Sequence, residues 1–320
     1  MPSVRIAKPG LLTTVQDRGR WGFQSFGVSV SGPMDAYSHR LANAIAGNGN
    51  DAAALEVTMT GPELEFEDAR TVAVAGALFE VWIDDRLIAM RSAVEVVPGS
   101  ILRFGRRLRG ARAYVAISGG ITTPVQLGSR ATHVPSGMGG LGGRALKAGD
   151  RLPLGSVAGA TPRSPAPHRP PLAPSQQAWA LPDGHAILRV LPGPQADRFV
   201  PAAFDVLQSS PYSIAGDSNR MGYRLIGPPL EFAIRSDVIS DATPAGVLQV
   251  PAAGQPILLL ADRQTTGGYP KIAAVISADI CVAGQLAPGD SVSFVACSQR
   301  DALAALIAQE RSLMAASARR

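Results

Sequence analysis

A polar segment at residues 261–271 holds the densest set of reactive side chains in the sequence. Those side chains are Asp262, Arg263, Gln264, Thr265 and Lys271. Together they offer a ligand a carboxylate, a guanidinium, an amide, a hydroxyl and an ammonium, and Gly267-Gly268 lets the backbone approach it closely. Apolar runs at 257–260 and 272–276 flank the segment, which is typical of a loop between two buried strands. We interpret it as a functional loop; the alternative is an Asp–Arg pair that ties the loop to its own barrel.

Three further polar clusters interrupt the apolar chain, at residues 13–22, 30–35 and 217–225. Their candidate site residues are Gln16, Asp17, Arg18 and Arg220. Side chains of this kind, set among apolar runs, are expected where a rigid scaffold presents functional groups.

The basic residues are almost all arginines. The sequence has 30 Lys plus Arg against 25 Asp plus Glu, a net charge of +5, and its lysines are Lys8, Lys147 and Lys271. The densest basic stretch, 103–112, lies between two strand-like runs and is predicted to be a hairpin tip. A solvated turn and a phosphate-binding patch are both compatible with it. Because only Phe104 adds an aromatic ring to this stretch, nucleic-acid binding is disfavoured.

The common catalytic and metal-binding motifs are missing from the sequence. It has no GxxxxGK[ST] phosphate loop and no GxSxG hydrolase motif, and its four histidines lack the spacing of a metal site. Residues 137–142 match GxGxxG, but no convincing crossover helix follows them, so a glycine-rich loop is favoured over a dinucleotide site. We therefore predict no metal site and no P-loop in this chain.

The length predicts two domains. A chain of 320 residues has room for two units of ~150 residues, and a proline-rich joint lies near its middle. We predict a first unit at 1–156, a proline-rich linker or loop at 157–185, and a second unit at 186–320 that ends in a helix. The similar segments GPELEF at 61–66 and GPPLEF at 227–232 are compatible with a duplicated domain.

Strand-like runs dominate the chain and helices are few. Strands are predicted at 71–75, 79–83, 93–97, 112–118, 186–191, 256–261, 272–277 and 291–296. Helices are predicted between Pro33 and Gly47, at 195–207 with an interruption at Pro201, and at 301–317. The predicted class is mainly β with a few helices, in closed or nearly closed barrels that leave few strand edges.

The composition also suggests a compartment. No apolar run approaches the length of a membrane span, and the first residues show no secretory signal. Two cysteines, Cys281 and Cys297, cannot build a disulfide framework. We expect a cytoplasmic protein.

The polar clusters carry a resemblance to a known family. The segments that match are KPGLLTTVQDRGR at 8–20, SGPMD at 31–35, ALEVT at 54–58, GPELEF at 61–66, LPGPQ at 191–195, RMGYRL at 220–225 and ADRQTTGGYPK at 261–271. With them the chain resembles the C subunit of 5-oxoprolinase, a family also described as biotin-dependent carboxyltransferase, allophanate hydrolase subunit 2-like or KipA-like. The long last segment makes the resemblance specific.

The resemblance implies two cyclophilin-like β-barrel units and two partners, a KipI-like B subunit and a LamB/YcsF-like subunit. Together these subunits would form an ATP-dependent 5-oxoprolinase, which opens 5-oxoproline (pyroglutamate) to glutamate. One alternative is a carboxyltransferase component that moves a carboxyl group from carboxybiotin to urea or a related amide. Because the chain has no Met-Lys carrier motif, that biotin would be carried by another protein. A second alternative is a non-catalytic KipA-like regulator that binds a KipI-like inhibitor.

For the 5-oxoprolinase interpretation, residue chemistry suggests roles. The expected catalytic residues are Asp262 or Asp17 as base and Lys271 as charge stabiliser. The expected substrate-binding residues are Gln264 and Thr265 as a hydrogen-bonding clamp, Arg263, Arg220 and Arg18 as partners of the substrate carboxylate, and Gln16. ATP would be used by the complex.

Overall fold

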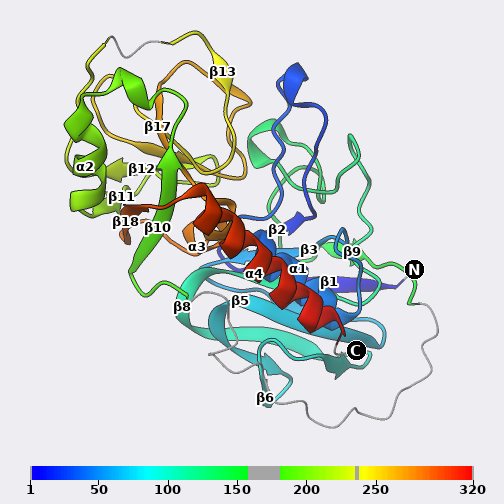
Figure 1. Cartoon of the computed structure of the whole chain (residues 1–320). Helices are drawn as coiled ribbons and strands as arrows, with labels where there is room; N and C mark the ends of the chain where they lie inside the picture. The colour runs from blue at the N-terminus through cyan, green and yellow to red at the C-terminus, as the bar shows by residue number, and fades with distance from the viewer. Residues whose placement is uncertain (1, 158–180, 235–237, 319–320) are drawn as a thin grey trace. The chain divides into compact units, whose positions relative to one another are not determined.

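The computed structural model describes residues 2–157, 181–234 and 238–318, and the chain forms two compact units (Figure 1). Unit 1 comprises Met1–Arg20, Asp35–Ala180 and Glu310–Arg320, and unit 2 comprises Trp21–Met34 and Leu181–Gln309. Each unit is therefore assembled from segments that are distant in the sequence. The proline-rich linker predicted at 157–185 lies mostly outside the described residues.

Unit 1 contains a curled, half-barrel sheet. Its strands are β1 (Ser3–Lys8), β2 (Leu12–Gln16), β3 (Ala54–Thr58), β4 (Glu63–Phe66), β5 (Arg70–Ile83), β6 (Arg86–Ile88), β7 (Val94–Val96), β8 (Ile101–Ile117) and β9 (Arg151–Pro153). They pair in the order β2-β3-β8-β4-β1-β9, and β5 also pairs with β6, β7 and β8. Alternate strand residues such as Leu55, Val57 and Val115 are fully buried in one hydrophobic cluster.

The basic stretch 103–112 lies inside a strand. β8 pairs with β5 over most of its length, and the register shifts beside Gly110, which has a φ of 72°. The prediction of a hairpin tip here is wrong. Gly105 and Gly110 suggested a turn, but Gly110 instead lies at an irregularity within a strand that remains paired with β5 on both sides of it. The arginine side chains are mostly exposed, so the strand has no apolar alternation there to reveal it.

Helix α1 (Ala36–Ala46) begins and ends where its sequence signals place it. The Asp35 carboxylate accepts a hydrogen bond from the Ser38 backbone N–H at 2.9 Å, which caps the first turn. Gly47, with a φ of 85°, ends the helix in the left-handed conformation that glycine favours.

Unit 2 contains a closed barrel. Its strands, in barrel order, are β10 (His185–Pro192), β17 (Lys271–Val275), β14 (Val247–Gln249), β15 (Ile257–Leu259), β12 (Gly222–Ile226), β11 (Tyr212–Ile214) and β18 (Ser291–Ala296). Two short strands, β13 (Asp241–Ala242) and β16 (Thr266–Gly267), form a separate antiparallel pair. Leu188, Leu248 and Leu258 are among the fully buried residues of its core.

The described residues contain three further α-helices: α2 (Pro201–Ser209), α3 (Ile280–Ala283) and α4 (Gln299–Ala318). The prediction of one helix at 195–207 is partly wrong. Pro201 is the first residue of α2, where its missing N–H has no helical acceptor to lose, and a short 3-10 turn at Ala196–Arg198 precedes it. The expected class, mainly β with a few helices and two barrel-type units, is confirmed.

Candidate functional site

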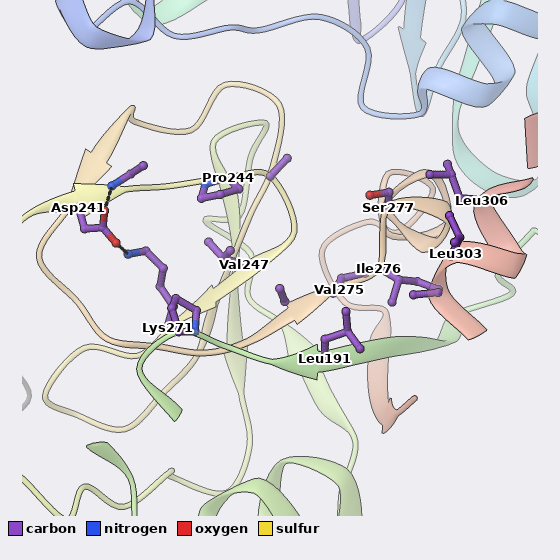
Figure 2. Close-up of a pocket in the computed structure, with 15 residues that line it drawn as sticks. Leu191, Asp241, Pro244, Val247, Lys271, Val275, Ile276, Ser277, Leu303 and Leu306 are labelled. Atoms are coloured by element: carbon purple, nitrogen blue, oxygen red, sulfur yellow. Dashed lines mark hydrogen bonds and ion pairs between the residues drawn. The ribbon is translucent and has the colours of Figure 1, made fainter. Parts of the chain in front are cut away.

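A cavity of about 540 Å³ in unit 2 contains Lys271 (Figure 2). Its walls come from the end of β10, the chain between β13 and β14, β17 and the first turns of α4. Its polar side chains are Asp241, Lys271 and Ser277, and its other lining residues are Leu191, Pro194, Ala242, Pro244, Ala245, Val247, Ala274, Val275, Ile276, Ala302, Leu303 and Leu306. A cavity of this size, apolar with a few polar groups, is typical of small-molecule sites.

Lys271 brings a buried ammonium to this cavity. Its side chain is 1% exposed, and Nζ donates to Asp241 Oδ2 at 2.9 Å, whereas the Asp241 side chain is 56% exposed. The hydrogen bond from Lys271 lowers the pKa of Asp241 from its ordinary value of 3.8, because it stabilises the carboxylate. The backbone N–H of Lys271 donates to Gln195 Oε1 at 3.1 Å, which fixes the strand at this point.

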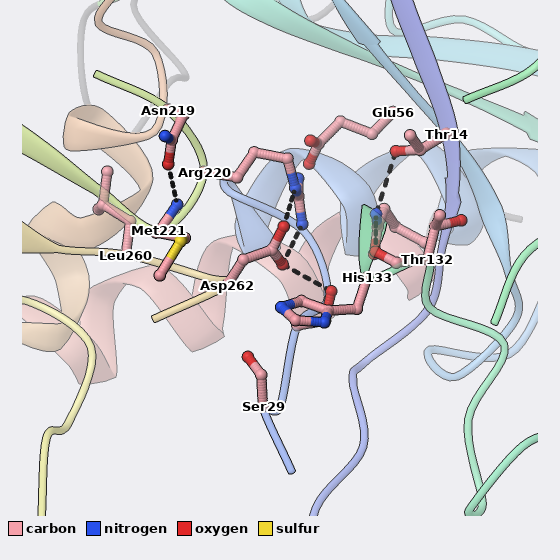
Figure 3. Close-up of polar contacts among 12 residues, drawn as sticks. Thr14, Ser29, Glu56, Thr132, His133, Asn219, Arg220, Met221, Leu260 and Asp262 are labelled. Atoms are coloured by element: carbon pink, nitrogen blue, oxygen red, sulfur yellow. Dashed lines mark hydrogen bonds and ion pairs between the residues drawn. The ribbon is translucent and has the colours of Figure 1, made fainter. Parts of the chain in front are cut away.

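Asp262 and Arg220 form a second ion pair in unit 2, with both partners buried (Figure 3). Arg220 Nε donates to Asp262 Oδ2 at 2.8 Å and Arg220 Nη2 to Oδ1 at 3.1 Å, so the guanidinium holds the carboxylate with two bonds. Ser31 Oγ donates to Asp262 Oδ1 at 2.6 Å, and Arg220 Nη2 donates to the Gly32 carbonyl at 2.6 Å. The pair therefore anchors the segment 29–32 to the barrel loops.

Backbone hydrogen bonds hold the two loops of this pair together. Asp262 N–H donates to the Arg220 carbonyl at 2.9 Å, and Leu260 N–H donates to the Met221 carbonyl at 3.0 Å. Ser31 has a φ of 58°, an unusual conformation for a residue with a Cβ. The hydrogen bond of its side chain to Asp262 helps to hold that conformation.

The other polar residues of the 261–271 loop stabilise the loop itself. Arg263 donates to the carbonyls of Thr243 at 2.6 Å and Leu260 at 3.1 Å, and burial lowers the pKa of its guanidinium. Gln264 Nε2 donates to Gln249 Oε1 at 3.1 Å. Thr265 accepts a hydrogen bond through its carbonyl from Thr243 N–H at 3.1 Å.

The three predicted residues of unit 1 differ in their surroundings. The Asp17 carboxylate accepts from Gly19 N–H, Ser129 Oγ and Arg130 N–H at 3.0, 2.5 and 2.5 Å. Arg18 is exposed and pairs with Asp51 at 3.0 Å. Gln16 is fully buried, and its Nε2 donates to Thr14 Oγ1 at 3.0 Å and to the Thr132 carbonyl at 3.1 Å.

A buried polar row in unit 1 went unnoticed in the sequence. Thr14, Glu56 and Tyr114 are cross-strand neighbours on β2, β3 and β8. Tyr114 Oη donates to Glu56 Oε2 at 2.8 Å, and burial raises the pKa of this phenol well above 10. His39 of α1 is fully buried beside the Gln16 carbonyl, and desolvation lowers the pKa of its imidazole. The sequence signal that could have revealed this row is the presence of polar residues within otherwise apolar strands.

Comparison with known proteins places the chain in a family. Residues 26–296 match the family described as carboxyltransferase domain, subdomain A and B. The chain belongs to this family.

Two curated relatives and one solved structure show the range of this carboxyltransferase family. The chain is 40% identical over 308 residues to the C subunit of 5-oxoprolinase from Escherichia coli, covering 96% of each protein. It is 37% identical to urea amidolyase of Lachancea kluyveri, covering 91% of this chain but 17% of that protein. The crystal structure of Kluyveromyces lactis urea carboxylase aligns with a TM-score of 0.89 and 35% identity, over 97% of this chain and 29% of the other.

In this carboxyltransferase-family chain, the predicted site residues of unit 2 fall into two groups: those around the Arg220–Asp262 pair, and Lys271 at the cavity. Three of the four polar clusters meet in unit 2, through Ser31, Arg220 and Asp262. Lys271 belongs to the cavity instead, with Asp241 as its partner. Asp241 was missed because it lies outside every polar cluster.

Among the residues that the structure describes, no group of three or more His, Cys, Asp or Glu side chains is placed to hold a metal ion. In the same part of the chain, no helix is long and apolar enough to cross a membrane.

Proposed function

We propose that this chain belongs to an ATP-dependent 5-oxoprolinase that opens 5-oxoproline to glutamate, together with a KipI-like B subunit and a LamB/YcsF-like subunit. The observation that carries the proposal is the end-to-end match to the C subunit of 5-oxoprolinase, which covers 96% of both proteins. The fungal urea amidolyases, by contrast, extend far beyond this chain. A chain that matches 96% of that subunit is expected to do the same work in its complex.

The reaction breaks the lactam C–N bond and adds water, so negative charge develops on the carbonyl oxygen. Lys271 is the predicted site residue that lines a cavity, and we assign it contact with the substrate. Asp262 and Asp17 were expected as bases, but each carboxylate already accepts three hydrogen bonds. We therefore assign both aspartates a positioning role.

Arg220, expected to bind the substrate carboxylate, has its Nε/Nη2 edge committed to Asp262. Arg263 donates to backbone carbonyls. The proposal therefore assigns both arginines to loop positioning, and leaves Gln264 and Thr265 of the same unit as substrate-binding candidates. ATP would be used by the assembled complex, since this chain has no P-loop.

The test is glutamate release from 5-oxoproline and ATP by this chain with its two partners, omitting each component in turn. We expect release from the full mixture, loss without this chain, and a drop of at least tenfold with Lys271→Met. Asp217→Asn, in an exposed ion pair of the same unit, is the matched control. An intact complex without glutamate release would overturn the proposal.

The second candidate is carboxyl transfer from a biotin on a separate carrier protein to urea or a related amide. The urea carboxylase structure, with its TM-score of 0.89, favours it. Transfer of the carboxyl group from a carboxybiotin carrier to a urea nitrogen, giving N-carboxyurea and the free biotin carrier, would establish this candidate in place of the first if it occurred with this chain and its KipI-like partner and without 5-oxoproline turnover.

A further inference from the structure

The two partners of the Lys271–Asp241 pair differ sharply in exposure. The Lys271 side chain is 1% exposed and that of Asp241 is 56% exposed. A buried ammonium is unfavourable without an anion, whereas an exposed carboxylate is well hydrated alone. The cation therefore always needs an anionic partner, but that partner can be exchanged.

Lys271 also has hydrogen-bonding capacity to spare. An ammonium carries three N–H donors, and among the described residues Asp241 Oδ2 is the acceptor recorded for Nζ. Lys271 and Asp241 both line the cavity, so an oxygen acceptor bound there would lie next to the ion pair. Asp241 itself sits on a strand of two residues that pairs only with β16 among the described strands.

The rest of the cavity is mainly apolar. Away from the ion pair its walls are aliphatic side chains apart from Ser277, with Leu303 and Leu306 of α4 at the opposite end (Figure 2). Among the described lining residues, Lys271 is the single cation. One ammonium suits a single carboxylate better than a phosphate, which usually has several cations or a row of backbone N–H groups around it.

We propose that this cavity binds a small carboxylate with an apolar body, whose carboxylate pairs with Lys271 while its body lies against the aliphatic wall. Asp241 then competes with the ligand for Lys271. Its carboxylate accepts the hydrogen bond from Lys271 when no ligand is bound, and rotates toward solvent when the ligand carboxylate takes its place. This site is separate from the buried Arg220–Asp262 pair. The inference shares Lys271 and this cavity with the proposed function, and binding to this chain alone tests it separately from the reaction.

The experiment is calorimetric titration of the full chain at pH 7 with hexanoate, and with hexanamide as the uncharged match. We expect hexanoate to bind at least tenfold more tightly than hexanamide, and Lys271→Met to remove that difference. Asp241→Asn deletes the competing charge and should tighten hexanoate binding severalfold. If the cavity instead took a cationic ligand through Asp241, the same variant would not tighten hexanoate.

Two variants on α4 test the apolar end. Leu303 is 58% exposed, so Leu303→Asp should fold normally and weaken hexanoate binding severalfold by charge repulsion and lost apolar contact. Ala304→Asp adds the same charge on an exposed neighbour outside the cavity and should leave binding unchanged. Failure of hexanoate to bind both the wild type and Asp241→Asn would overturn the proposal, as would weaker binding to Asp241→Asn than to the wild type.

Discussion

Two ion pairs of unit 2 have the same kind of charged partners but differ in the burial of the carboxylate. In the Arg220–Asp262 pair both side chains are under a tenth exposed, and the aspartate accepts three hydrogen bonds. In the Lys271–Asp241 pair only the cation is buried, and one hydrogen bond joins the partners. A saturated, enclosed pair fixes loops in place, whereas an unsaturated pair at a cavity leaves its cation able to take another anion. Burial of the anion, more than the presence of a charge pair, separates the two roles.

The largest effect expected from this comparison is on stability. Arg220→Met leaves the Asp262 carboxylate buried without its cation, so we expect a loss of about 3–5 kcal/mol in the free energy of unfolding. Lys271→Met leaves an exposed, hydrated carboxylate, so we expect a clearly smaller loss than for Arg220→Met. Urea unfolding followed by circular dichroism measures both variants.

The double variant Arg220→Met/Asp262→Leu removes both charges and should recover most of the stability that Arg220→Met loses. Arg224→Met, which breaks the exposed pair with Asp217, is the control and should cost about 0–1 kcal/mol. Equal losses for Arg220→Met and Lys271→Met would erase the distinction between the two pairs.

A smaller effect is expected at Ser31, which supports the saturated pair. Ser31→Ala removes the hydrogen bond to Asp262 but keeps a Cβ at a φ of 58°, so we expect a loss of about 1.5–3 kcal/mol. Ser31→Gly loses the same bond but relieves about 1–2 kcal/mol of backbone strain, so it should be the more stable of the two. The same urea titration compares them, and a less stable glycine variant would contradict the strain argument.

The sequence predicted the class of fold well and the contacts of the site less well. Strand periodicity and helix boundaries, such as the stop at Gly47 after α1, depend on local residues and are visible in a single chain. The strand at 103–112 was missed because long-range pairing with β5 outweighed its local turn signals. Ser31, Arg220 and Asp262 each stood in a predicted polar cluster, but their meeting depends on how distant loops pack. No local sequence pattern marks Asp241 as a site residue, because its role depends on the hydrogen bond from Lys271, thirty residues further along the chain.

The smallest effect concerns the pH dependence of the unsaturated pair. The hydrogen bond from Lys271 holds the pKa of Asp241 below 3.8, so Lys271→Met should raise it toward 3.8, as measured by carbon-detected NMR titration of the side-chain carboxyl. A pKa depressed in the folded state stabilises the fold above the unfolded value, and this contribution disappears as the pH falls through the folded pKa. The pair's contribution to stability should therefore be constant above about pH 5 and decline below pH 3.8.

Asp301 is the internal control for that titration. The pKa of its carboxyl is also lowered, but chiefly by hydrogen bonds from the side chain and backbone of Ser298, which Lys271→Met leaves in place. The variant should therefore move the Asp241 titration and leave that of Asp301 where it is. If the two shift together, the change reflects a general loss of structure; if neither shifts, Lys271 does not hold Asp241 in solution, and the cavity has no built-in competitor to displace.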